Sequence, residues 1–103
     1  MKRYVYLIRS QDNGYYKIGV SKNPQKRIEA LQTGNSSKLK LINKFLTEYP
    51  TKIETSLHSR YSHTKKNGEW FDLTIEDELK FIDECKKIEK NINFLVENGN
   101  IFI

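Results

Sequence analysis

The chain has 103 residues, a length typical of one folded domain, and we expect a single domain over residues 1–103. Only 37% of its residues are hydrophobic, and no stretch approaches the roughly 20 apolar residues that a bilayer crossing requires. One cysteine excludes an internal disulfide, and no set of Cys and His has zinc-finger spacing. Since no signal-peptide hydrophobic stretch follows the first residues, the chain is expected to be intracellular.

Basic residues are concentrated in the first two thirds of the chain. Residues 1–72 carry 14 Lys and Arg against 6 Asp and Glu, a net charge of +8, whereas residues 73–103 have a net charge of −3. A basic segment of this kind indicates a polyanionic partner, most often nucleic acid. An A/T-rich genome would also enrich lysine, which supplies 14 of the 18 basic residues. Charge alone therefore leaves nucleic-acid binding and compositional bias both open.

Two strands and a tight turn are predicted at the start of the chain. Residues 2–9 are rich in β-forming residues with apolar side chains at both parities, which favours a buried central strand. Asn13-Gly14 follows, and this dipeptide between two β-rich runs predicts a type I′ hairpin turn, which requires a positive φ at both central residues. Residues 15–21 then form the second strand.

A two-residue loop fixes which residues of the hairpin face each other. It places Asp12 opposite Tyr15, and it pairs Tyr6, Ile8 and Ser10 with Ser21, Gly19 and Lys17 in that order. Tyr6, Lys17 and Gly19 then share a polar face, and the opposite face is a core made of Val5, Leu7, Tyr16, Ile18 and Val20. A glycine within a strand leaves space beside Tyr6 and often marks the close approach of a ligand or backbone.

Start and stop signals locate the remaining elements. Asn23-Pro24 predicts a helix start, Gly34 predicts its end, and Thr74 predicts the cap of a later helix. The expected elements are a helix over residues 24–33, a strand over 38–46, a helix from 50 to about 62 and a long helix over 75–96. The predicted fold is an α+β domain with a three-stranded antiparallel sheet flanked by helices, a ββαβα core followed by a long C-terminal helix.

The long helix carries an apolar stripe. Its members are Leu79, Ile82, Cys85, Ile88, Ile92 and Leu95. Packing onto the domain core is the expected use of this stripe, so the chain is expected to be a monomer. A dimer formed through the same stripe is the alternative.

A set of residues in the first two thirds resembles the GIY-YIG nuclease superfamily in order and spacing. Tyr4-Val5-Tyr6 stands where that family has GIY, and Lys17-Ile18-Gly19 stands where it has YIG. Arg27 and a helical Glu54 follow, so that Tyr6, Gly19, Arg27 and Glu54 match while Tyr4 and Lys17 depart from the pattern. With Glu54-x-x-x-His58 and Gly68-Glu69-Trp70-Phe71, the chain looks most like a small viral and bacteriophage branch described as DNA-binding. The resemblance covers residues 3–73, which leaves 74–103 as a helical extension.

The resemblance implies metal-dependent hydrolysis of a phosphodiester bond. It implies that Glu54 holds one Mg²⁺ (or Mn²⁺), which favours carboxylate, water and phosphate oxygens as ligands. Arg27 would hold the scissile phosphate through its bidentate fork. Tyr6 would act as the base or orient the nucleophile, and because a phenol is a poor base at neutral pH, Lys17 would favour its ionised form. His58 is a candidate for contacting phosphate or water.

Each of these residues also has an ordinary structural interpretation. Tyr6 is equally typical of a half-buried strand, Lys17 of a solvated one, and Arg27 of a helix that covers apolar surface. Thr51-x-x-Glu54 has the form of a capping box, in which Glu54 would close back onto the start of its helix.

Further residues near this pattern have weaker claims to a site. His63 cannot share a helix face with Glu54 and is expected at the surface. Residues 69–71 are typical of a packing segment, with Glu69 and Asn67 as alternative site candidates.

DNA is the expected partner, bound through its backbone without sequence specificity. Gly19 is expected beside the nucleic acid, together with the lysines of the basic segment, Lys22, Lys26, Lys38, Lys40, Lys44, Lys52, Lys65 and Lys66. Three functions remain open: a metal-dependent DNA endonuclease, a DNA-binding module of the same fold that does not cut, and a basic protein-interaction domain that dimerises through its C-terminal helix.

Overall fold

The computed structural model describes residues 1–66 and 69–99, and it confirms the α+β class. In chain order the elements are β1 Arg3–Ser10, β2 Tyr16–Ser21, α1 Pro24–Thr33, β3 Leu39–Thr47, α2 Pro50–Arg60, a 3₁₀ turn Ser62–Thr64, α3 Ile75–Leu79 and α4 Phe81–Glu97. The sheet has the order β2-β1-β3 with both neighbours antiparallel to β1, so the first strand is central as predicted. Over the described part of the chain, no helix has the length and apolar character that crossing a membrane requires.

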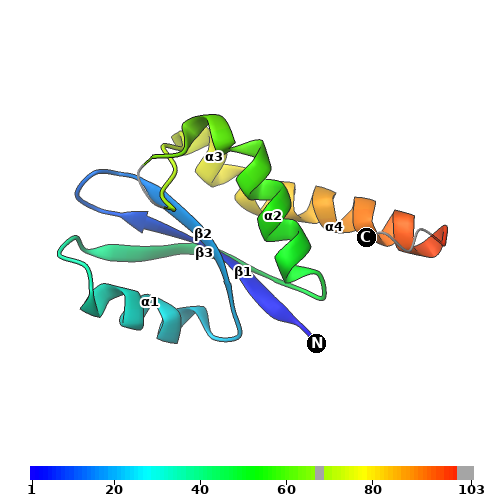
Figure 1. Cartoon of the computed structure of the whole chain (residues 1–103), viewed down its shortest axis with the longest axis horizontal. Helices are drawn as coiled ribbons and strands as arrows, with labels where there is room; N and C mark the ends of the chain where they lie inside the picture. Colours follow the sequence, from blue (N-terminus) through cyan, green and yellow to red (C-terminus); the bar gives the residue numbers. More distant parts are fainter. Residues whose placement is uncertain (67–68, 100–103) are drawn as a thin grey trace.

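Helices cover both faces of the sheet, with α1 on one face and α2 and α4 on the other (Figure 1). Alternate residues of β1 therefore enter two separate cores, which explains its apolar side chains at both parities. Val5 and Leu7 pack with Leu57 of α2 and Cys85 of α4, among others. On the α1 face the second, smaller cluster consists of Tyr6, Ile8, Ile28 and Leu39. The predicted core face of the hairpin is confirmed, since Tyr16 and Ile18 are buried in the larger core and Val20 packs against it.

The hairpin turn is longer than predicted. Ser10 N donates to Tyr15 O at 2.8 Å and Gly14 N donates to Ser10 O at 2.9 Å, so residues 11–14 form a four-residue loop. Gly14 has a positive φ of 74°, whereas among the described non-glycine residues none has a positive φ. A type I′ turn needs positive φ at both central residues, so that part of the prediction is wrong. Asn13 instead accepts a hydrogen bond from Tyr15 N through its side chain at 2.9 Å.

The longer loop shifts the strand register by two residues from the predicted one. Tyr6 faces Gly19 rather than Ser21, and Ile8 faces Lys17 rather than Gly19. A shift of two residues keeps every side chain on its face, which is why the predicted division into two faces is correct although the pairs are wrong.

The C-terminal helix is broken rather than continuous. It divides at Lys80 into α3 and α4, so the prediction of one helix over residues 75–96 is wrong at this point. Cys85 and Ile92 of the apolar stripe are buried in the larger core, and Ile82 and Ile88 pack against it. Leu79, by contrast, has 75% of its surface exposed. The centre of the stripe is therefore used for core packing and is not available as a dimer surface.

Thr74 caps the start of α3 as predicted, and with Asp77 it forms a capping box, which was not predicted. Thr74 Oγ1 accepts from Asp77 N at 3.1 Å, and Thr74 N donates to Asp77 Oδ2 at 3.0 Å. Replacing Thr74 with alanine is expected to lower the free energy of unfolding by about 1 kcal/mol, because it leaves a backbone donor of α3 without its acceptor. Urea denaturation measures this change. Thr51→Ala is the matched control, since Thr51 lies inside the first turn of α2 and caps nothing; an equal loss in both variants would contradict the prediction.

Candidate functional site

One cavity gathers the residues that the sequence singled out. We call it the edge cavity; its volume is about 220 Å³, and it lies beside the edge strand β2. Its lining residues are Tyr6, Lys17, Ile18, Gly19, Val20, Arg27, Glu54, His58 and Glu69. All five predicted catalytic residues therefore lie together with Gly19, although they come from β1, β2, α1 and α2. Their catalytic roles remain predictions.

The outer edge of β2 explains where the edge cavity forms. On this edge Tyr16 exchanges backbone hydrogen bonds with Phe71, each at 2.8 Å. Two residues further along, the Ile18 carbonyl accepts a hydrogen bond from His58 Nε2 at 2.9 Å. The backbone of Phe71 and the side chain of His58 thus cover a strand edge that would otherwise offer unpaired groups to another chain. The same contact holds α2 against the strand and places His58 at the cavity wall.

The bond to Ile18 also fixes the protonation pattern of the His58 ring. Because a carbonyl oxygen only accepts, Nε2 carries a proton, and Nδ1 is the acceptor nitrogen in the neutral ring. The ring packs edge-on against Phe71, with centroids 5.1 Å apart and planes inclined by 64°. A role for His58 in contacting water or phosphate therefore rests on Nδ1.

Lys17 is held by an acidic and an aromatic neighbour. Its Nζ lies 2.9 Å from Glu69 Oε2, and the Lys17 side chain is only 15% exposed. The same Nζ is 5.8 Å from the centroid of the Trp70 ring. The hydrogen bond from Lys17 lowers the pKa of Glu69 below its ordinary value. The ammonium group expected to support an ionised Tyr6 is therefore partly neutralised by Glu69.

Glu54 is partly buried in the edge cavity and does not cap its own helix. Tyr49 occupies the N-cap position of α2 and the helix has no side-chain cap, so the capping box with Thr51 is absent. Burial raises the pKa of Glu54, Glu69 raises it further, and His58 opposes both. Among the described residues Glu54 forms no ion pair with a Lys or Arg. A carboxylate in this setting gains stability from a bound cation.

Tyr6 and Gly19 form a cross-strand pair in which the tyrosine ring fills the space that the glycine leaves. Tyr6 is 2% exposed, and a methyl group built on Gly19 would overlap its Oη and Cζ atoms. The space predicted beside Tyr6 is thus occupied by Tyr6 itself. The pair sets the position of the phenol at the edge cavity.

Arg27 reaches the edge cavity from the opposite side, on α1. The start of that helix is fixed as predicted, with Asn23 Oδ1 accepting from Lys26 N at 3.2 Å and Pro24 as the first residue. Arg27 N donates to Asn23 O at 3.1 Å, which places Arg27 in the second turn with its side chain exposed. A cationic residue of α1 and the carboxylate-bearing Glu54 of α2 thus line the same cavity.

The residues present fit a metal ion that keeps most of its water. Within residues 1–66 and 69–99, no group of three His, Cys, Asp or Glu side chains is arranged to hold a metal. The His and Cys ligand sets of a structural zinc site are therefore not found in that part of the chain. A single carboxylate, completed by water and by a phosphate of the substrate, is instead the kind of site that Mg²⁺ accepts.

The lysines predicted to bind the DNA backbone, Lys22, Lys26, Lys38 and Lys40, are exposed, and their contact with DNA stays a prediction. His63 is exposed, as expected. Asn67 and Gly68 lie outside the described residues.

The sequence did not reveal that Glu69 pairs with Lys17, because the pairing joins residues far apart in the chain.

A comparison with protein families matches residues 3–93 to the model of the T5orf172 domain. The chain belongs to the T5orf172 domain family. This T5orf172 domain falls in a phage-type class of nuclease-associated or DNA-binding domains, consistent with a DNA partner. The matched region extends beyond β3 and α2 and takes in α3 and most of α4. No curated protein and no solved structure matches the chain.

Proposed function

We propose that the chain is a GIY-YIG-like endonuclease that hydrolyses DNA phosphodiester bonds with one divalent metal ion. The observation that carries the proposal is the edge cavity, in which Tyr6, Gly19, Arg27 and Glu54 line the same small volume. These are the four residues that match the superfamily pattern, and they come from four different elements. Membership of a nuclease-associated family supports the same assignment.

Glu54 would hold the metal, Mg²⁺ or Mn²⁺. Its partly buried carboxylate has a raised pKa and lacks a cationic partner among the described residues, which favours a cation at this position. When bound, a divalent ion of this kind supplies Lewis-acid stabilisation of the charge that develops on phosphate and leaving-group oxygens.

Arg27 and His58 would act on the phosphate and the attacking water. The guanidinium of Arg27 is permanently charged and can donate two parallel hydrogen bonds to phosphate oxygens, which orients the scissile group. His58 Nδ1, the acceptor in the neutral ring, is available for a proton from water because Nε2 donates to Ile18 O. Tyr6, packed over Gly19, would orient that water through its hydroxyl group.

DNA binding without cleavage is a second candidate, and one observation favours it. The ammonium of Lys17 pairs with Glu69 at 2.9 Å, so it is not free to favour an ionised Tyr6. A site of this kind would retain Arg27 and the exposed lysines for phosphate binding, while Tyr6 would lack the support of a free Lys17 ammonium.

Incubation of a supercoiled plasmid with the protein and Mg²⁺ or Mn²⁺ tests the proposal. Nicking is expected in either metal and none with EDTA. Arg27→Ala is expected to slow nicking by about 10²- to 10³-fold, the range found for loss of one preorganised donor to transition-state charge. Arg27→Lys keeps the charge but loses the bidentate fork and is expected to remain impaired.

Lys86→Ala on α4 is the control for loss of one positive charge and is expected to nick normally, because Lys86 is exposed and is not one of the residues that line the edge cavity. No nicking in either metal, with salt-sensitive DNA binding retained, would replace the nuclease by the binding module. An absence of DNA binding at low salt would overturn both functions.

A further inference from the structure

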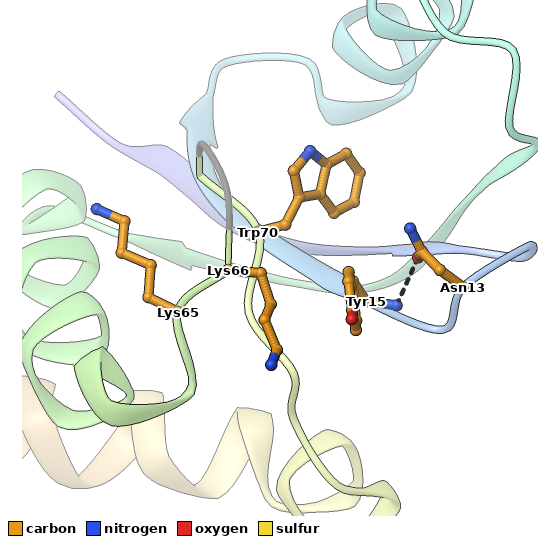
Figure 2. Close-up of a pocket in the computed structure, with 5 residues that line it drawn as sticks. All are labelled: Asn13, Tyr15, Lys65, Lys66 and Trp70. Atoms are coloured by element: carbon orange, nitrogen blue, oxygen red, sulfur yellow. Dashed lines mark hydrogen bonds between the residues drawn. The ribbon is translucent and has the colours of Figure 1, made fainter.

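A second, larger hollow adjoins the edge cavity. We call it the aromatic hollow; its volume is about 640 Å³, and it is lined by Asn13, Tyr15, Lys65, Lys66 and Trp70 (Figure 2). Two aromatic residues, two lysines and one asparagine thus line it, and none of the lining residues that the structure describes is acidic. None of these residues takes part in the proposed cleavage chemistry.

The backbone on both sides of the aromatic hollow is held in place by hydrogen bonds. On the hairpin side, Asn13 Oδ1 accepts from Tyr15 N at 2.9 Å, the bond drawn in Figure 2. On the other side, Lys66 N donates to Trp70 O at 2.7 Å, and the neighbouring Phe71 pairs with β2 through Tyr16. Trp70 also packs against the smaller core cluster. The backbone that carries both aromatic residues, and the Trp70 ring itself, are therefore positioned by the fold before any ligand arrives.

Lys17 and Trp70 connect the aromatic hollow to the edge cavity. Tyr15 of the hollow and Lys17 of the cavity lie on the same face of one extended segment, two residues apart, which is about 7 Å along a strand. Glu69 lines the cavity and the adjacent Trp70 lines the hollow. Lys17 Nζ contacts both of them, at 2.9 Å from Glu69 Oε2 and 5.8 Å from the Trp70 ring centroid. The distance of about 7 Å between Tyr15 and Lys17 is of the order of the length of one nucleotide in an extended single strand of nucleic acid.

The chemistry of the lining selects a flat ring attached to an anionic backbone. Every nucleobase has a π-face that stacks on Tyr or Trp, and ammonium groups beside the rings suit the adjoining phosphates. A base inside a duplex is already stacked on its neighbours and paired, so it does not enter a hollow of this kind without being extruded.

We propose that the aromatic hollow binds an unpaired nucleobase next to the phosphate held in the edge cavity. The inference rests on the proposed function and narrows its substrate to nucleic acid with at least one unpaired nucleotide beside the scissile bond. Tyr15 and Trp70 supply the stacking surface, and Lys65 and Lys66 contact the flanking phosphates.

Tryptophan fluorescence tests the proposal without any cleavage, because Trp70 is the only tryptophan of the chain. The full chain is titrated in EDTA with a short single-stranded oligonucleotide, with an oligonucleotide of the same length that lacks all its bases, and with a blunt duplex. Quenching of the Trp70 signal is expected with the single strand. The baseless strand is expected to bind about tenfold more weakly and to leave the signal unchanged, since stacking contributes about 1–3 kcal/mol per base. This arm needs no protein variant.

Variants assign the effect to the hollow. Tyr15→Ala is expected to weaken single-strand binding by about tenfold, whereas Phe94→Ala, which removes a 60% exposed ring on α4, leaves it unchanged. Equal affinity and equal quenching for the single strand, the baseless strand and the duplex would overturn the inference. Plasmid nicking by the same protein would then leave the proposed function standing, whereas failure to bind any of the three nucleic acids at low salt would remove both.

Discussion

Replacing Glu54 with glutamine is expected to abolish nicking while raising the melting temperature of the chain at pH 7. The amide keeps the shape of the side chain and removes the negative charge that would hold the metal. If the metal supplies several kcal/mol of transition-state stabilisation, nicking falls by about a thousandfold or more. The stability gain has a separate origin, the burial of Glu54 in the edge cavity.

The direction of the stability change follows from the pKa of Glu54. Burial raises this pKa in the folded chain above its value in the unfolded chain. Between the two pKa values the folded state binds more protons, so stability falls as the pH rises through that window. Above the folded-state pKa the wild-type chain carries the full penalty of a partly buried charge, and Glu54→Gln removes it. Below the unfolded-state pKa both states hold a neutral carboxyl group, and the advantage of the glutamine variant disappears.

Thermal unfolding measured across a range of pH, with and without Mg²⁺, checks the stability change of Glu54→Gln and the binding of the metal by Glu54. Mg²⁺ is expected to raise the Tm of the wild-type chain at pH 7, since a ligand that binds only the folded state stabilises it, and to leave Glu54→Gln unchanged. Glu29→Gln serves as the matched control, because Glu29 is exposed on α1 and outside the edge cavity. Normal nicking by Glu54→Gln, or an equal response of both proteins to Mg²⁺, would show that Glu54 does not hold the metal.

The bounds of a helix or strand could be predicted from the sequence where a few neighbouring residues determine them. Asn23, Pro24 and Gly34 located α1 at both ends, because a cap, a fixed φ and a helix stop are properties of a few neighbouring residues. The hairpin shows the limit of such signals. Asn13-Gly14 is compatible with several loops, and the backbone pairing of Ser10 with Tyr15 selects the four-residue one. Local sequence therefore predicted a turn but not its type.

The broken C-terminal helix has a similar explanation. Residues 75–96 are continuous in helical pattern, yet the structure divides at Lys80. Phe81 directly after the break is buried in the larger core, and Tyr16 donates to Glu78 Oε1 at 2.7 Å just before it. One tertiary contact before Lys80 and one after it thus fix α3 and α4 separately on the domain. Neither contact can be inferred from the sequence of residues 75–96 alone.

The candidate site was predictable as a set of residues but not as a set of contacts. Order and spacing singled out Tyr6, Arg27 and Glu54, and the structure places all three at the edge cavity. The bond from His58 to Ile18 spans 40 residues, and Lys17 finds its partner in Glu69. Partners this distant depend on how the helices dock on β2, which no local pattern specifies.

Gly19→Ala is expected to destabilise the fold and to impair nicking, although it adds a single methyl group. That methyl would overlap the Oη and Cζ atoms of Tyr6. Tyr6 is 2% exposed and packs with Ile8 and Ile28, so its ring cannot swing away without losing buried contacts. Overpacking of this kind lowers the free energy of unfolding by about 1–3 kcal/mol. Any displacement of the ring also moves its hydroxyl group, so nicking is expected to fall even under conditions where the variant is fully folded.

Urea denaturation of a double-mutant cycle separates this overlap from a general intolerance of alanine. In a Tyr6→Leu background the shorter side chain makes room for the methyl, so Gly19→Ala is expected to change stability much less than it does in the wild-type chain. Gly34→Ala is the matched control, because a Cβ there meets nothing within 4 Å and its φ of −94° suits alanine. That change is expected to be neutral or stabilising by up to about 1 kcal/mol. Equal losses for Gly19→Ala in both backgrounds would show that the Tyr6 ring is not what requires glycine and that Gly19 does not set the position of the phenol.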